Sequence, residues 1–282
     1  MALHRIAVLG AGTMGHGIAY AALAGGFDVQ LFDVDGAALD TGRAAIGEIV
    51  AKALEIGKLS PAGAREATSR LGASTDLGAA LDRADLVIEA APERLDLKLA
   101  LFAEIARLAP PAAFVASNTS ALSITEMAAT LADPTRVAGM HFFNPVHKMK
   151  LVEIVRALET SPATLQAIEE VARRMGKETV IVRESPGFIT TRVNASIGNE
   201  AFYMLMEGVA SARDIDKALK LGLNHPMGPF ELVDLVGLDT RLSILEYLHR
   251  AMGEKYRPCP LLVQYVKAGR LGKKVGRGVY DY

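Results

Sequence analysis

Short apolar runs alternate with longer amphipathic stretches over the first 184 residues. The apolar runs are brief and rich in Val, Ile or Phe, which is typical of buried strands. They are RIAVLG (5–10), DVQLFD (28–33), DLVIEA (85–90), AFVASN (113–118), RVAGMHFF (136–143), KLVEIV (150–155) and ETVIV (178–182). Helical patterns lie between them, over 13–24, 36–56, 94–108 and 162–176. This alternation predicts an α/β domain in which a doubly wound, mostly parallel sheet carries helices on both faces.

The pattern changes at ESPGF (184–188). After Pro186-Gly187, apolar residues recur at helical spacing, beginning with Ile189 and Val193. From there to residue 282, helical stretches are separated by Gly/Pro breaks and no strand pattern appears. We therefore expect two domains, an α/β domain over 1–184 and a smaller all-helical domain over 185–282.

Composition narrows the class of protein. The chain has 282 residues, of which 50% are hydrophobic and 22% charged, and its net charge is −1 without a polybasic tail. These values fit a globular protein and give no indication of a nucleic-acid partner. No signal-peptide pattern and no apolar run of membrane-spanning length is present. A single cysteine, Cys259, fits a reducing compartment, so we expect a cytoplasmic protein without a membrane partner.

A glycine-rich motif follows the first predicted strand and opens the first helix. It reads Gly10-x-Gly12-x-x-Gly15, with Thr13 and Met14 between the last two glycines. In this context the first glycine permits a tight turn, the second leaves room for a pyrophosphate, and the third allows close helix–strand packing. The helix start offers free N–H groups to the phosphates. The motif predicts a Rossmann-type dinucleotide site in the first domain; the alternative is a glycine turn without a ligand.

An acidic residue, Asp33, ends the second predicted strand about 20 residues after the glycines. A carboxylate at this point accepts hydrogen bonds from the ribose hydroxyls and repels a 2′-phosphate. Asp33 therefore favours NAD over NADP as the cofactor.

The stretch HFFNPVHKMKLVEIV (141–155) places a histidine and a carboxylate on two neighbouring apolar strands. A turn around Asn144-Pro145 joins these strands, so the side chains of His141 and Glu153 can meet. Histidine suits proton removal near neutral pH, and a carboxylate on its other ring nitrogen fixes the tautomer. The alternative is a core histidine that binds a backbone carbonyl.

Several longer motifs carry a family resemblance. They are IEAAPERLDLK (88–98), ASNTSALSI (116–124), HFFNPVHKMKLVEIV (141–155), SPGF (185–188) and HPMGPFELVDLVGLDT (225–240). With them the chain resembles the L-3-hydroxyacyl-CoA dehydrogenases, and most of all the short bacterial 3-hydroxybutyryl-CoA dehydrogenase type. The resemblance implies hydride transfer between NAD and C3 of an acyl-CoA substrate. It also implies that the helical domain binds substrate and forms a homodimer.

The resemblance also implies roles for individual residues. His141 and Glu153 would be the catalytic couple, and the Ser120 hydroxyl would contact the substrate oxygen close to the nicotinamide. Further cofactor contacts would come from Glu93, Lys98, Asn118, Asn144 and Lys274. Each has a plainer alternative: strand-end caps for Asn118 and Ser120, solvated helix charges for Glu93 and Lys98, a turn residue for Asn144, and a basic tail for Lys274. No metal ligand is expected.

The resemblance also implies contacts to the substrate. Lys52 and Lys58 lie in the region where the family has a lysine that contacts coenzyme A, and either can be a solvated helix charge instead. Thr191 stands where many members carry an asparagine, and a hydroxyl cannot span the distance of an amide. Either a water fills the gap, or the role passes to Asn194 or Asn199, three and eight residues on, since both spacings can share a helix face with Thr191.

Two other functions compete with this prediction. One is a β-hydroxyacid dehydrogenase of the 3-hydroxyisobutyrate kind, whose lysine motif we do not find near residues 160–180. The other is a dinucleotide-binding protein that has lost catalysis, for which Thr191 is the only argument.

Overall fold

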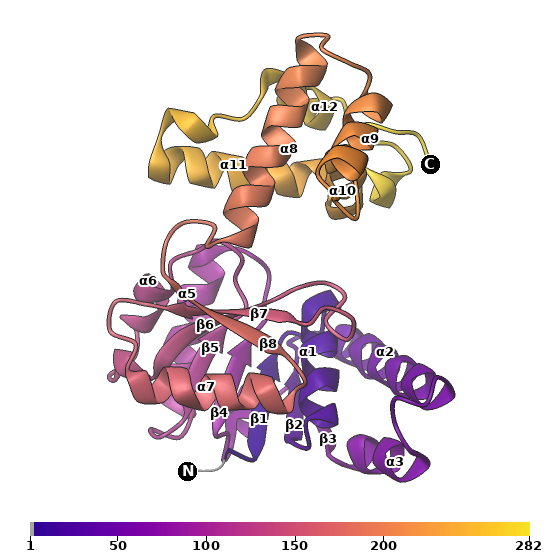
Figure 1. Cartoon of the computed structure of the whole chain (residues 1–282). Helices are drawn as coiled ribbons and strands as arrows, with labels where there is room; N and C mark the ends of the chain where they lie inside the picture. Colours follow the sequence, from indigo (N-terminus) through magenta and orange to yellow (C-terminus); the bar gives the residue numbers. More distant parts are fainter. Residues whose placement is uncertain (1–2) are drawn as a thin grey trace. The chain divides into compact units, whose positions relative to one another are not determined.

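In the described part of the chain, residues 3–282, eight strands form one sheet in the order β3-β2-β1-β4-β5-β6-β7-β8. The computed structural model divides into two units, one ending at Glu184 and the other spanning Ser185–Tyr282 (Figure 1). All strand pairs are parallel except β6 with β7. The strands are β1 Arg5–Leu9, β2 Asp28–Phe32, β3 Leu71–Ser74, β4 Leu86–Glu89, β5 Phe114–Ser117, β6 Val137–Phe142, β7 Leu151–Arg156 and β8 Glu178–Arg183.

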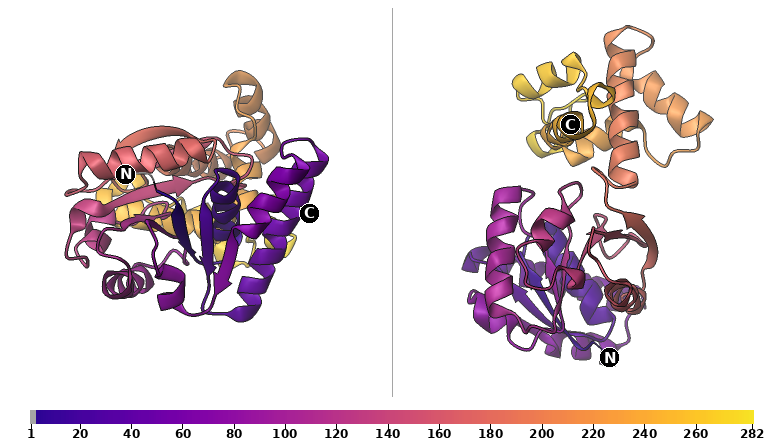
Figure 2. Two further views of the ribbon diagram at one scale, coloured as in Figure 1. Left: turned by 90° about the horizontal axis from the view of Figure 1, so that it is seen from below. Right: turned by 90° about the vertical axis from the view of Figure 1, so that its left-hand side faces the viewer.

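The helices of the first unit cover both faces of the sheet, as predicted. Helices α1 and α7 share one apolar core, which contains Ile18 and Ile168 together with Ile6 and Val8 of β1. Helix α5 lies on the opposite face (Figure 2). The helices are α1 Thr13–Ala24, α2 Gly36–Glu55, α3 Pro61–Ser69, α4 Leu77–Leu81, α5 Leu95–Leu108, α6 Ile124–Ala128, the 3₁₀ turn η1 Pro134–Arg136 and α7 Pro162–Arg174.

The predicted α/β fold is confirmed, and the predicted elements of this unit lie within two residues of the observed ones. The short elements α3, β3, α4 and α6 were not predicted. Helix α3 begins with Ser60-Pro61, where the Ser60 hydroxyl accepts a hydrogen bond from the Gly63 N–H at 3.0 Å. Strand β3 reads LGAS and has no β-branched or aromatic residue, so only its pairing with β2 identifies it as a strand.

The second unit is helical, apart from isolated bridges near its end. Its core contains Phe202, Phe230, Leu238, Leu245 and Leu248. The elements are α8 Thr190–Met206, α9 Ala212–Gly222, α10 Pro229–Val236, α11 Leu238–Met252, η2 Glu254–Tyr256, α12 Pro260–Lys267 and η3 Lys273–Val275.

Two buried charged residues stand out in this helical unit. Asp234 is fully buried and accepts hydrogen bonds from the N–H groups of Val279 and Tyr280 and from the Tyr282 hydroxyl, at 2.8–2.9 Å. These bonds fasten the last residues of the chain to α10. Arg241 is also buried, and burial lowers its pKa to about 10. Its Nε finds no hydrogen-bond partner within residues 3–282.

No helix of the described chain is both long enough and apolar enough to cross a lipid bilayer.

Candidate functional site

The glycine motif forms a turn at the carboxyl end of β1, and each glycine has a distinct steric environment. Gly10 has a φ of +108°, and a Cβ there would lie 2.6 Å from the carbonyl oxygen of Ala90. A Cβ on Gly15 would lie 1.7 Å from the carbonyl oxygen of Gly10. Around Gly12, by contrast, a Cβ would meet no atom within 4 Å. Gly10 and Gly15 are therefore required by the turn itself, whereas Gly12 faces open space, and its predicted contact with a pyrophosphate stays a prediction.

The N-terminus of α1 and the end of β2 complete this part of the site. Gly12 caps α1 without a side-chain hydrogen bond, so the first N–H groups of the helix have no side-chain cap. Asp33 directly follows β2, and its carboxylate accepts hydrogen bonds from the N–H groups of Ala11 at 2.8 Å and Asp35 at 3.1 Å. The carboxylate is thereby held against the glycine turn. The exposed Thr13 and half-buried Met14 are in the first turn of α1.

The histidine and glutamate of the β6–β7 hairpin lie directly opposite each other in the antiparallel register. His141 Nδ1 is 2.7 Å from Glu153 Oε2. His141 is 5% exposed and Glu153 is 0% exposed, so water screens this interaction little. When Nδ1–H donates to the carboxylate, the neutral ring has its lone pair on Nε2. This arrangement can accept a proton at Nε2 and stabilise the resulting imidazolium through Glu153.

Asn118 connects the end of β5 to the strand that carries His141. Its Oδ1 accepts a hydrogen bond from the Phe142 N–H at 2.9 Å, and its own N–H donates to the Glu89 carbonyl at 2.8 Å. The ring of Phe143 lies 4.6 Å from that of His141, measured between centroids. The predicted cap role of Asn118 is therefore present in the structure, and its predicted cofactor contact stays a prediction.

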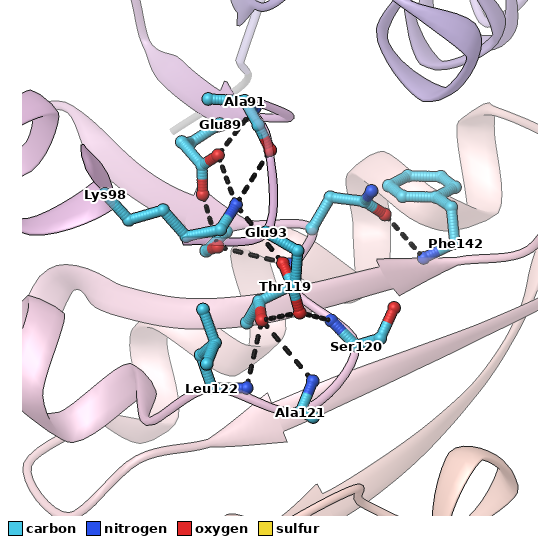
Figure 3. A network of polar contacts seen from close by, with 11 residues as sticks. Glu89, Ala91, Glu93, Lys98, Thr119, Ser120, Ala121, Leu122 and Phe142 are labelled. Atoms are coloured by element: carbon cyan, nitrogen blue, oxygen red, sulfur yellow. Dashed lines mark hydrogen bonds and ion pairs between the residues drawn. The ribbon is translucent and has the colours of Figure 1, made fainter. Parts of the chain in front are cut away.

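Ser120 lies in the loop after β5, and Glu93 holds this loop in place (Figure 3). Glu93 Oε1 accepts hydrogen bonds from the Thr119 hydroxyl at 2.5 Å and from the Ser120 N–H at 2.8 Å. The Thr119 hydroxyl in turn accepts a bond from the Leu122 N–H at 3.0 Å. The bond to Glu93 thus fixes the backbone of Ser120. The Ser120 residue is half-buried.

Lys98 and Glu93 do not form the pair of solvated helix charges considered above. Lys98 is only 1% exposed, and its Nζ lies 2.6 Å from Glu89 Oε1 and 3.5 Å from Glu93 Oε2. Glu89 is fully buried at the end of β4. Glu89 was not among the predicted site residues, although a carboxylate at the end of the buried run LVIE is a signal that could have identified it.

The other predicted contacts lie apart from this network. Asn144 is exposed and precedes Pro145 in a cis peptide bond. In the second unit, Thr191 and Asn194 are half-buried on α8, and the Lys274 Nζ binds both carboxylate oxygens of Asp239 at 2.7 Å. Their predicted roles toward cofactor or substrate stay predictions.

His147 lies in the β6–β7 turn, and the charges of several basic residues act on its pKa. Burial lowers the pKa of His147, and the charges of Lys148, Lys58, Lys177 and His16 lower it further. The ring of His147 also meets that of Tyr20 on α1, at 6.4 Å between centroids and edge to face. We call Lys58, Lys148, Lys177 and His16, together with His147, the cationic cluster. The other candidate, Lys52, instead binds Glu55 at 2.8 Å.

The described residues contain no group of three or more His, Cys, Asp or Glu side chains suited to hold a metal ion. The carboxylates close to the glycine turn are instead occupied by N–H, hydroxyl and ammonium donors.

Comparisons with known proteins agree with this geometry. Residues 5–185 match the family model described as "3-hydroxyacyl-CoA dehydrogenase, NAD binding domain", and residues 187–282 match its C-terminal domain. A probable 3-hydroxybutyryl-CoA dehydrogenase of Bacillus subtilis is 48% identical, over 100% of this chain and 98% of the relative. A 3-hydroxybutyryl-CoA dehydrogenase of Bradyrhizobium diazoefficiens is 45% identical, over 99% of this chain and 96% of the relative.

Among solved structures, the (S)-3-hydroxybutyryl-CoA dehydrogenase of Ralstonia eutropha has a TM-score of 0.95 and 42% identity, covering 100% of this chain and 99% of its own. The two family models together span nearly the whole sequence, in the same order as the two units. The chain belongs to the 3-hydroxyacyl-CoA dehydrogenase family.

Proposed function

We propose that this protein oxidises the 3-hydroxyl group of a short-chain acyl-CoA, 3-hydroxybutyryl-CoA in the first place, with NAD, and catalyses the reverse reduction of acetoacetyl-CoA. The observation that carries this proposal is the buried His141–Glu153 couple in a unit that also holds a glycine turn with an acidic partner, Asp33. The short-chain preference is supported by the names of the two curated relatives and of the solved structure.

The reaction assigns a task to each of these groups. Bound NAD supplies the hydride acceptor. His141 removes the hydroxyl proton at Nε2, because Nδ1 faces Glu153, and the carboxylate stabilises the imidazolium that forms. The Ser120 hydroxyl orients the substrate oxygen, while Glu93 holds the Ser120 backbone. Asp33 contacts the ribose of the cofactor.

Cofactor choice and substrate class are tested in one assay. We expect the purified protein to consume NADH when acetoacetyl-CoA is added, and to use NADPH much more slowly because Asp33 repels the 2′-phosphate. The loss of nicotinamide absorbance measures both rates. Equal rates with NADH and NADPH would contradict the role of Asp33. No turnover with any 3-ketoacyl-CoA despite NADH binding would favour a protein that has lost catalysis.

The cationic cluster gives the proposed substrate a place for its phosphates. Coenzyme A carries a pyrophosphate and a 3′-phosphate, and cations around His147 would attract them. We expect Lys58→Ala to raise KM for acetoacetyl-CoA about tenfold, with an unchanged KM for acetoacetyl-pantetheine, which lacks these phosphates. Lys52→Ala is the control, because Lys52 already binds Glu55. An equal rise of KM for both substrates would contradict phosphate binding at the cationic cluster.

We further propose that the helical unit forms a homodimer. Several apolar side chains of this unit are more than half exposed, and a dimer interface would bury such side chains. They are Val193, Val209, Leu221, Leu223 and Leu235. A dimer mass in light scattering at micromolar concentration is expected, and a monomer mass would refute it.

A further inference from the structure

Glu89 carries a buried charge directly beside the proposed cofactor site, at the carboxyl end of β4. Its carboxylate accepts three hydrogen bonds (Figure 3). Oε1 accepts from the Lys98 ammonium and from the Ala91 N–H, both at 2.6 Å, and Oε2 accepts from the Ser117 hydroxyl at 2.5 Å. Stability alone does not readily explain such a group, because a buried ion pair is often no more stable than apolar residues of similar volume.

Each donor belongs to a different segment at the carboxyl edge of the sheet. Ala91 follows Ala90, whose carbonyl oxygen lies only 2.6 Å from the position that a Cβ on Gly10 would take, so this backbone packs against the glycine turn. Ser117 ends β5 and directly precedes Asn118. Lys98 lies in the first turn of α5. Glu89 therefore joins the glycine turn, the end of β5 and the start of α5. It lies at the carboxyl ends of the paired strands β1 and β4, between which the strand order reverses, and dinucleotides bind at such a point of a doubly wound sheet.

A second carboxylate extends this chain of contacts to Ser120. Lys98 Nζ also donates to the Ala91 carbonyl at 3.1 Å and lies 3.5 Å from Glu93 Oε2. Glu93 Oε1 binds the Ser120 N–H. Because Glu89 provides the shorter of the two ion pairs of Lys98, it limits how far the ammonium can move toward Glu93, and Glu93 in turn sets the position of the Ser120 loop.

We propose that Glu89 is a positioning residue of the dehydrogenase reaction, which acts through Lys98 and Glu93 on the Ser120 loop and through Ala91 on the glycine turn. This inference rests on the proposed function. It assigns to a fully buried carboxylate the task of keeping two parts of the site in register.

The test is a double-mutant cycle with Glu89→Gln and Lys98→Met. Glu89→Gln is expected to raise both Kd and KM for NADH and to lower kcat/KM about tenfold to hundredfold, the range seen when groups that orient other ligands are removed. In the Lys98→Met background the same change should cause a smaller loss, because the route through Lys98 is gone and only the contact with the Ala91 N–H remains. Ser117→Ala, which leaves both charges in place, should have a smaller effect in the same direction.

Asp85→Asn provides a matched control. Asp85 immediately precedes β4 at its opposite end, and its carboxylate accepts hydrogen bonds from the N–H groups of His4 and Arg5 at 2.7 and 2.9 Å. Its loss should lower the melting temperature without changing kcat or the affinity for NADH.

Two results would overturn the proposal. One is a Glu89→Gln protein that melts earlier but keeps kcat and NADH affinity within twofold of the parent. The other is a loss of the same size in the Lys98→Met background. If Glu89→Gln alone does not fold, the charge-neutral double variant Glu89→Gln/Lys98→Met is compared with Lys98→Met. This comparison measures the effect of Glu89 when Lys98 is absent. NADH affinity is measured by fluorescence and does not depend on turnover. A parent protein inactive on acyl-CoA would therefore contradict the proposed function, while the double-mutant cycle for NADH affinity would still test the role of Glu89.

Discussion

Replacing His141 by glutamine is expected to lower kcat by about 10²–10⁴-fold, the usual contribution of a general base, while NADH affinity stays nearly unchanged. The base is lost, but the glycine turn and Asp33 belong to other strands and keep their contacts. Stopped-flow measurement of NADH consumption with acetoacetyl-CoA gives the rate, and nicotinamide fluorescence gives the affinity. Glu153→Gln should be milder but still substantial, because the imidazolium loses a buried anionic partner.

A second histidine–glutamate pair in the chain supplies a matched control. His249 Nε2 lies 3.1 Å from Glu254 Oε1 in the helical unit, where Glu254 is mostly exposed. His249→Gln should leave kcat unchanged. A His141→Gln protein with more than a tenth of the parent kcat would show that another group removes the proton.

Alanine at Gly15 is expected to destabilise the first unit by about 2–3 kcal/mol or more, because the new Cβ would lie 1.7 Å from a backbone oxygen that no side-chain rotation can move. The turn must open, and NADH binding is lost with it. Alanine at Gly12 should leave the melting temperature nearly unchanged, since its Cβ meets no atom within 4 Å. It should nevertheless weaken NADH binding, because that space is where the pyrophosphate is expected.

Thermal unfolding and NADH titration of the two variants separate the two roles. Gly47→Ala on α2 is the control, since this exposed glycine also has open space around it. It should raise stability by about 0.5–1 kcal/mol without an effect on NADH affinity. A Gly12→Ala protein that binds NADH as tightly as the parent would place the pyrophosphate elsewhere.

Prediction of the fold from sequence succeeded where the signals are local. Buried strands such as RIAVL and LVEIVR are distinguished by their Val and Ile content, and the helices by amphipathic spacing. Local sequence patterns do not predict β3, because LGAS becomes a strand only by pairing with β2 at the sheet edge. A short strand without β-branched residues depends on its neighbour, which a local pattern does not contain.

For the site, the chain alone was enough to locate the glycine turn, Asp33 and the two strands carrying His141 and Glu153, since each is marked by residue type at a fixed spacing. The register that sets His141 opposite Glu153 and brings their side chains to 2.7 Å was decided by the sheet. The burial of Lys98 against Glu89 was likewise decided by the fold, because residues nine positions apart meet only when α5 packs beside the end of β4. Residue type states what chemistry is available, whereas distance and desolvation, which determine how strongly charges interact, arise only when segments remote in sequence pack together.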